Sequence, residues 1–203
     1  MERQPVTKLE AAKRQLDTAI KLYFENEDSL SVHTLAYASF KILFDHYPSF
    51  HSDGYSAKID ELIQHPALGW SRFSRTANFL KHADRDPLDE LEYHDAEHVE
   101  GVIGLAACLY RRITGDFTPR MRGFDCWTES LHPEAFDIPP DPDPYVAAQE
   151  DEAVMAIRAL PLSERLAIGK VMSDALTKFW EMKEAGEIDG TEPKDEIIRR
   201  LEK

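Results

Sequence analysis

The chain has 203 residues, 42% of them hydrophobic, which suits one domain with an appendage or two small domains. Its net charge of -14 repels phosphate backbones and anionic lipid, and so argues against a broad DNA-binding or membrane-binding surface. No stretch resembles a membrane span or the apolar core of a signal peptide, and the two cysteines make no disulfide framework. These features predict a cytoplasmic protein.

Apolar residues recur at spacings of three and four through the first 115 residues, which predicts a series of helices. The second helix has two neighbouring apolar faces, so it is expected to be central. Gly115 is expected to end the last helix of this series. The predicted helices cover about residues 6–26, 31–45, 56–64, 69–83 and 95–114.

A run of four prolines divides the chain. These prolines lie in residues 137–144 and predict a stiff, extended linker. The linker separates a helical bundle domain, 1–136, from a C-terminal helical extension, 145–203. Within the bundle domain, residues 116–136 are expected to form an irregular or short-helical cover. No alternating strand pattern persists, so the predicted fold is an all-α helical bundle.

The C-terminal extension is expected to form a helical hairpin, with helices over about residues 145–160 and 163–185. Pro161 would break the two helices, and Ser163 would be the N-cap of the second. This pair is more apolar than a free hairpin should be, which indicates docking on a partner or on a second copy. The apolar face predicted for the second helix consists of Leu166, Val171, Met172, Ala175, Phe179 and Met182.

A polar stripe on the helix predicted over residues 69–83 is the first candidate site. Arg75, Asn78 and His82 fall at positions i, i+3 and i+7, so they share one face. Arginine can clamp a phosphate, and histidine can transfer a proton near neutral pH. The same stripe also fits a solvated face whose basic residues favour the helix C-terminus. Further binding candidates at its C-terminal end are Lys81, Asp84 and Asp86.

His33 is the second candidate, one turn into the central helix on its aromatic side. Two interpretations stay open. It is a hydrogen-bonded core residue, since buried polar groups are paired, or it faces His82 across the bundle and completes a pocket.

A metal site is the third candidate. His94 and His98 are four residues apart and could point at one ion, although the acidic residue between them, Asp95, also suits a helix N-terminus. Alternatively, facing helices of the bundle would supply ligands. These alternative ligands are His33, His82, Asp84 and Asp86. The patterns are unspecific, and neither a metal nor another cofactor is predicted.

Two resemblances extend these hypotheses. Residues 32–36 (VHTLA) and 78–87 (NFLKHADRDP) resemble a group of uncharacterised bacterial helical proteins, over about residues 6–115. Arg75 and His82, with six residues between them, resemble the motif of the HEPN superfamily of small, usually dimeric helical bundles. That resemblance implies metal-independent RNA cleavage, with Arg75 on the scissile phosphate and His82 as general acid/base. Thr76 departs from the polar Asn, Asp or His that commonly follows the arginine.

Three functions therefore remain as hypotheses. The favoured one is a helical interaction or binding module, with a protein or a second copy as partner. The second is a HEPN-like ribonuclease, for which local basic residues would form the groove for RNA. The third is a metal- or small-molecule-binding bundle. The basic residues near the motif are Arg72, Arg75, Lys81 and Arg85.

Overall fold

The computed structural model describes part of the chain, and every regular element within that part is a helix. The predicted all-α fold is therefore confirmed. The chain divides into two compact units: unit 1 is Met1–Tyr23 with Glu27–Asp116, and unit 2 is Phe24–Asn26 with Phe117–Lys203. The described residues are 5–64, 71–82, 84, 87–91, 96–132, 152–189, 197, 200 and 201.

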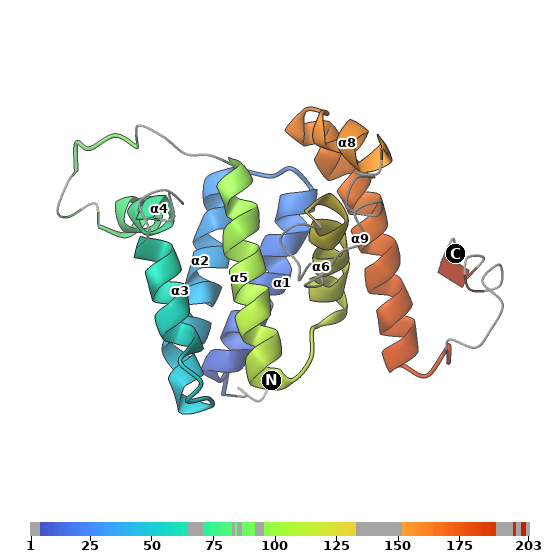
Figure 1. Ribbon diagram of the computed structural model, residues 1–203, viewed down its shortest axis with the longest axis horizontal. Coiled ribbons are helices and arrows are strands. Elements are labelled where there is room, and N and C mark those ends of the chain that lie inside the picture. Colours follow the sequence, from blue (N-terminus) through green and yellow to red (C-terminus); the bar gives the residue numbers. More distant parts are fainter. Residues whose placement is uncertain are drawn as a thin grey trace, which may run out of the picture. The chain divides into compact units, whose positions relative to one another are not determined.

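The helices of unit 1 closely follow the predicted bounds (Figure 1). Apolar periodicity located them because an amphipathic helix turns its apolar face to the core, as α1 does with Ala12, Leu16 and Ile20. A short 3-10 helix, η1 (Tyr47–Ser49), follows the second helix. The α-helices are α1 (Lys8–Phe24), α2 (Ser29–His46), α3 (Tyr55–Gln64), α4 (Ser71–Lys81) and α5 (Ala96–Thr114).

The turn between α1 and α2 shows how local sequence sets these bounds. Asn26 has a positive φ of 54°, a conformation that asparagine adopts more readily than most residues and that ends α1. The Glu27 N–H then donates to the Leu22 carbonyl at 3.1 Å. At the start of α2, the Asp28 side chain accepts a hydrogen bond from the Ser31 N–H at 2.8 Å and so caps the helix.

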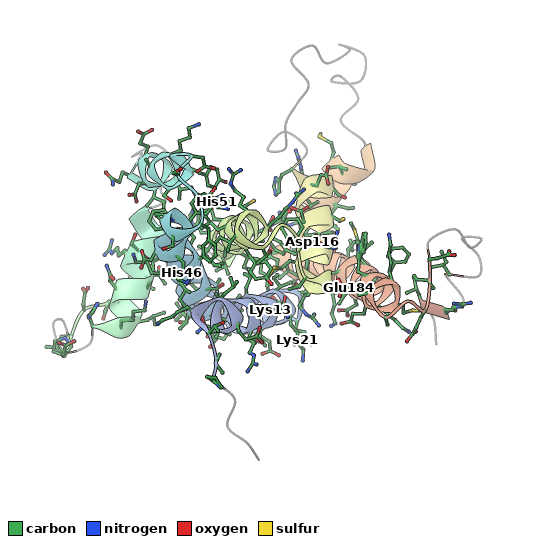
Figure 2. All side chains as sticks on the ribbon, turned by 90° about the horizontal axis from the view of Figure 1, so that it is seen from below. Lys13, Lys21, His46, His51, Asp116 and Glu184 are labelled. Carbon is green, nitrogen blue, oxygen red and sulfur yellow. The ribbon has the colours of Figure 1, made fainter. Side chains whose placement is uncertain are left out.

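Helix α2 is central to unit 1, as its two apolar faces predict. It packs against α4 and α5, and both views place it between the α3–α4 pair and the α1–α5 pair (Figures 1 and 2). Ser39, in the middle of α2, is fully buried and donates to the Ala12 carbonyl of α1 at 2.9 Å. The core around these helices consists of fully buried aliphatic residues, among them Leu16, Ile20, Leu43, Ile103 and Leu109.

Unit 2 contains a helix where the sequence predicted an irregular or short-helical cover. Helix α6 (Pro119–Leu131) is a regular α-helix of 13 residues. Thr118 explains its start, because the Thr118 hydroxyl accepts a hydrogen bond from the Met121 N–H at 3.1 Å. Proline at the first helical position needs no hydrogen bond of its own. Two further helices pack against α6: α8 (Glu152–Arg158) and α9 (Leu162–Glu184).

The N-cap predicted for α9 is wrong, and the predicted buried face is confirmed only at Leu166. Pro161 is the N-cap, so Ser163 lies inside the helix and caps nothing. Val171, predicted to be in the core, is 73% exposed. The residues that α9 buries are Leu166, Gly169, Ser173 and Thr177.

Close packing between α6 and α9 explains this unexpected face. A Cβ atom added at Gly123 would lie 2.9 Å from the Ser173 carbonyl oxygen, closer than real Cβ atoms come. One added at Gly169 would lie 2.8 Å from the indole ring of Trp127. Small residues thus let the two backbones approach, and such a face has too little hydrophobicity for periodicity to reveal it.

Several predictions fall outside the described residues or remain open. The linker at 137–144 lies outside them, so the boundary between the predicted domains is still a prediction. The predicted C-terminal hairpin is also open, since the packing partner that α8 and α9 share is α6. In the described part of the chain, no helix combines the length and hydropathy needed to cross a membrane.

Candidate functional site

The predicted polar stripe does not come together as one site in the described residues. Arg75 and Asn78 are exposed on α4 and line a shallow depression. Asp89 and Glu90 line the same depression, and their carboxylates oppose the binding of a phosphate there. His82 is half-buried at the end of α4, about 10 Å along the helix axis from Arg75, and is not among the described residues of this depression.

The remaining polar candidates form no metal cluster among the described residues. Asp84 is exposed, and Asp86 lies outside the described part. Of the two histidines considered for a metal ion, His94 also lies outside it, while His98 is half-buried on α5.

His33 and Lys81 both contact the ring of Tyr37. His33 is 2% exposed, and its imidazole stacks on Tyr37 with ring centroids 5.8 Å apart and planes inclined by 18°. The Lys81 ammonium lies 5.1 Å from the centroid of the same ring, a cation–π contact between the end of α4 and the middle of α2. His33 is thus a core residue, whereas Lys81 is exposed and able to meet a ligand.

Lys81 belongs to a group of lysines that the sequence analysis did not find. It lines a surface depression together with Lys8 of α1 and Lys41 of α2, and we call these three residues the lysine face. Lys41 pairs with Asp45 one turn along α2. Asp45 also lines this depression, and the other described residues there are Ala38, Ile42 and His46.

An apolar pocket of about 150 Å³ adjoins the lysine face, because Lys41 lines both. We call it the aromatic pocket. Three rings of α2 follow one another along it: the centroids of Tyr37 and Phe40 are 5.9 Å apart, and those of Phe40 and Phe44 are 5.6 Å apart. The other described residues that line it are Asp60, Ile63, Ser74, Val102 and Leu105.

Besides the lysine face and the aromatic pocket, a third group of residues links the segment after α2 to the end of α5 by polar contacts. The Asp53 carboxylate accepts hydrogen bonds from the Tyr55 N–H at 3.1 Å, the Tyr47 hydroxyl at 2.8 Å and Arg112 Nη2 at 2.6 Å. These hydrogen bonds favour the charged form of the carboxyl group and lower the pKa of Asp53 to about 2, and the bond from the Tyr55 N–H has the largest effect. The Arg112 guanidinium also stacks over the Tyr55 ring at 4.1 Å.

This third group has a structural role, because its members form hydrogen bonds with one another. Arg112 Nε donates to the Tyr47 hydroxyl at 2.7 Å, and the carbonyl oxygen of Arg112 lies 2.8 Å from Nε2 of His51. In Figure 2 His51 lies apart from His46, which belongs to the depression of the lysine face. The lysine face and the aromatic pocket therefore remain as the candidate site.

The sequence contained part of the signal for this site. Tyr37, Lys41 and Asp45 are spaced by four residues, which places them on one side of α2. Lys8 and Lys81 are far from them in the chain, so only packing brings these residues together.

No protein-family model, no curated protein and no solved structure matches this chain. The resemblances to the HEPN superfamily and to the bacterial group with the paired motifs therefore remain predictions. The function has to be argued from the geometry of unit 1.

Proposed function

We propose that this protein is a helical binding module whose lysine face takes a small anion. The observation that supports the proposal most is the convergence of Lys8, Lys41 and Lys81 from three helices, in a chain whose net charge is -14. Neighbouring cations repel one another, and Asp45 offsets one of the three charges through its ion pair with Lys41. A bound anion would offset the repulsion that remains.

The composition of the depression favours binding over catalysis. Lysine ammonium groups act as point charges that suit carboxylates and phosphates. Among the described residues that line the depression there is no hydroxyl or thiol nucleophile. The histidine there, His46, packs edge-on against Phe50 with ring centroids 5.4 Å apart. The site can therefore hold an anion without transforming it.

Titration with inorganic phosphate at low ionic strength, followed by NMR chemical shifts, tests this function. We expect the largest shifts at the backbone amides of Lys41 and Lys81. Lys81→Gln should weaken binding by up to about fivefold, since one exposed ion pair contributes about 0.2–1 kcal/mol. The matched control is Lys58→Gln, which removes the same charge from the exposed face of α3 and should change the affinity little. Equal weakening by both variants, or no saturable shifts, would rule the proposal out.

The HEPN-like ribonuclease remains the alternative from the sequence. It has less support, because Arg75 lies beside two carboxylates, and its depression does not include His82 among the described lining residues. RNA incubated in EDTA with wild type and with His82→Ala separates the two functions. We expect no cleavage by either protein. Cleavage by the wild type alone would establish the ribonuclease instead.

A further inference from the structure

We propose that the anion held by the lysine face carries a single aromatic ring, which enters the aromatic pocket. The ligand class is a small aromatic anion, with a carboxylate or a phosphate as its charged group. This inference rests on the proposed function and adds the apolar body of the ligand to its charged group.

The first support for the proposal is that the lysine face and the aromatic pocket are continuous. Lys41 lines both of them, so its stem borders apolar space while its ammonium, which pairs with Asp45, belongs to the lysine face. Tyr37 lines the aromatic pocket, and its ring carries the Lys81 ammonium at 5.1 Å. A ring seated beside Tyr37 therefore has its substituent within reach of two lysines.

The size of the pocket sets the size of the ligand. Its volume is about 150 Å³, and an apolar cavity of roughly this volume in another protein accommodates benzene. The side chains that line it suit a ring, because Tyr37, Phe40 and Phe44 are aromatic and aromatic rings pack well on one another. One six-membered ring fits, whereas a fused bicyclic system would need the helices to move.

The charges at the rim set the orientation of the ligand. Asp60 of α3 is exposed and lines the pocket, so it repels an anionic group placed near it. Lys81 at the end of α4 attracts such a group, and so does Lys41 on α2, whose charge Asp45 offsets in part. The charged group of the ligand therefore lies toward α2 and α4, and the ring lies between α2 and α5.

Isothermal titration calorimetry of the full chain tests the inference with four probes: inorganic phosphate, phenyl phosphate, benzoate and benzamide. We expect phenyl phosphate to bind at least tenfold more tightly than inorganic phosphate, because only the former buries a ring. We expect benzoate to bind at least fivefold more tightly than the isosteric but neutral benzamide. The order of phenyl phosphate and benzoate tells which anionic group the site prefers.

Ser74→Leu tests whether the ring uses the aromatic pocket. The half-buried Ser74 lines the pocket, and leucine would fill it. The variant should lower the affinity for phenyl phosphate to that for inorganic phosphate, and its unchanged inorganic phosphate binding shows that it is folded. The matched control is Ser56→Leu on α3, a half-buried serine that is not among the described lining residues; it should keep the wild-type preference. Should Ser74→Leu not fold, Lys81→Gln serves instead, since it should weaken benzoate binding and spare benzamide.

The outcomes separate this inference from the proposed function. Equal affinities for phenyl phosphate and inorganic phosphate would overturn the aromatic ligand and leave the anion site intact. Full phenyl phosphate affinity in folded Ser74→Leu would also overturn it. Absence of binding by all anions would overturn both proposals.

Discussion

Units 1 and 2 are both helical, but they fill their interiors in different ways. In unit 1, large side chains such as Leu16 and Ile103 fill the core, and a pocket remains beside α2. In unit 2, Gly123 and Gly169 let α6 and α9 approach closely: Gly123 lies against Ser173, and Gly169 lies against the rings of Phe24 and Trp127. The candidate site belongs to unit 1, because residues of this unit line both the lysine face and the aromatic pocket.

The largest expected effect is on the indole that fills unit 2. Trp127 is 2% exposed and packs against Phe24, with ring centroids 6.1 Å apart. Trp127→Ala should lower the free energy of unfolding by about 3–5 kcal/mol, because it removes a large buried side chain and leaves a cavity. Urea unfolding followed by circular dichroism measures this loss. Phe44→Ala, at a half-buried ring that already borders a pocket, should cost clearly less. Equal losses would contradict the contrast between the units.

A smaller effect tests the close approach in unit 2. Gly169→Ala should destabilise the protein by about 1–3 kcal/mol, because the new Cβ would overlap the rings of Phe24 and Trp127. Gly104→Ala on α5 is the control, since a Cβ there meets nothing within 4 Å. That substitution should stabilise the protein by about 0.5–1 kcal/mol through helix propensity. Thermal unfolding of both variants reveals the opposite signs. No loss of stability in Gly169→Ala would show that the α6–α9 contact tolerates a methyl group.

The next largest expected effect on stability concerns the N-caps of the helices in unit 2. Thr118→Ala should cost about 1 kcal/mol, because it removes the hydroxyl that accepts the Met121 N–H at the start of α6. Ser163→Ala, at the cap that the sequence predicted, should change the unfolding free energy by less than about 0.5 kcal/mol, since Ser163 is exposed inside α9. Chemical denaturation compares the two variants. If Ser163→Ala lost more unfolding free energy than Thr118→Ala, Ser163 would be the N-cap of α9, as the sequence predicted.

The smallest expected effect is the contribution of Asp53, in unit 1, to the pH dependence of stability. In the folded protein the pKa of Asp53 is about 2, below its ordinary value of 3.8. A lowered pKa means that this carboxylate stabilises the fold above pH 3.8 and that the contribution is lost as the pH falls toward 2. The effect is small, because solvent screens an exposed group. Urea midpoints at pH 5 and pH 2.5 should differ less in Asp53→Asn than in the wild type. If the urea midpoints of Asp53→Asn differ between the two pH values as much as those of the wild type, the charge of Asp53 does not contribute to the pH dependence of stability.

Particular residues show how far sequence patterns reach in this protein. The helices of unit 1 were predictable because each repeats large apolar side chains at helical spacing, as Leu16 and Ile20 do on α1. The start of α6 was also visible in principle, since Thr118 followed by proline is a typical N-cap sequence. The buried face of α9 was not, because glycine, serine and threonine at the contact carry little hydrophobic signal.

The candidate site was predictable only in part, for a similar reason. Lys81 was identified on α4 beside Asn78 and Arg75, where residues on one helix share a face. Neither Lys8 nor Lys41 was identified, because residues distant in the chain give no periodic pattern to detect.

The sequence by itself determined the helical class, the bounds of the helices in unit 1 and the central position of α2, because these depend on local periodicity, capping and side-chain volume. The tertiary structure alone decided which face of α9 is buried, that Tyr37 meets Lys81, and that three lysines border a pocket of aromatic rings. Those features depend on how closely helices approach and on which distant residues meet, and backbone packing sets both.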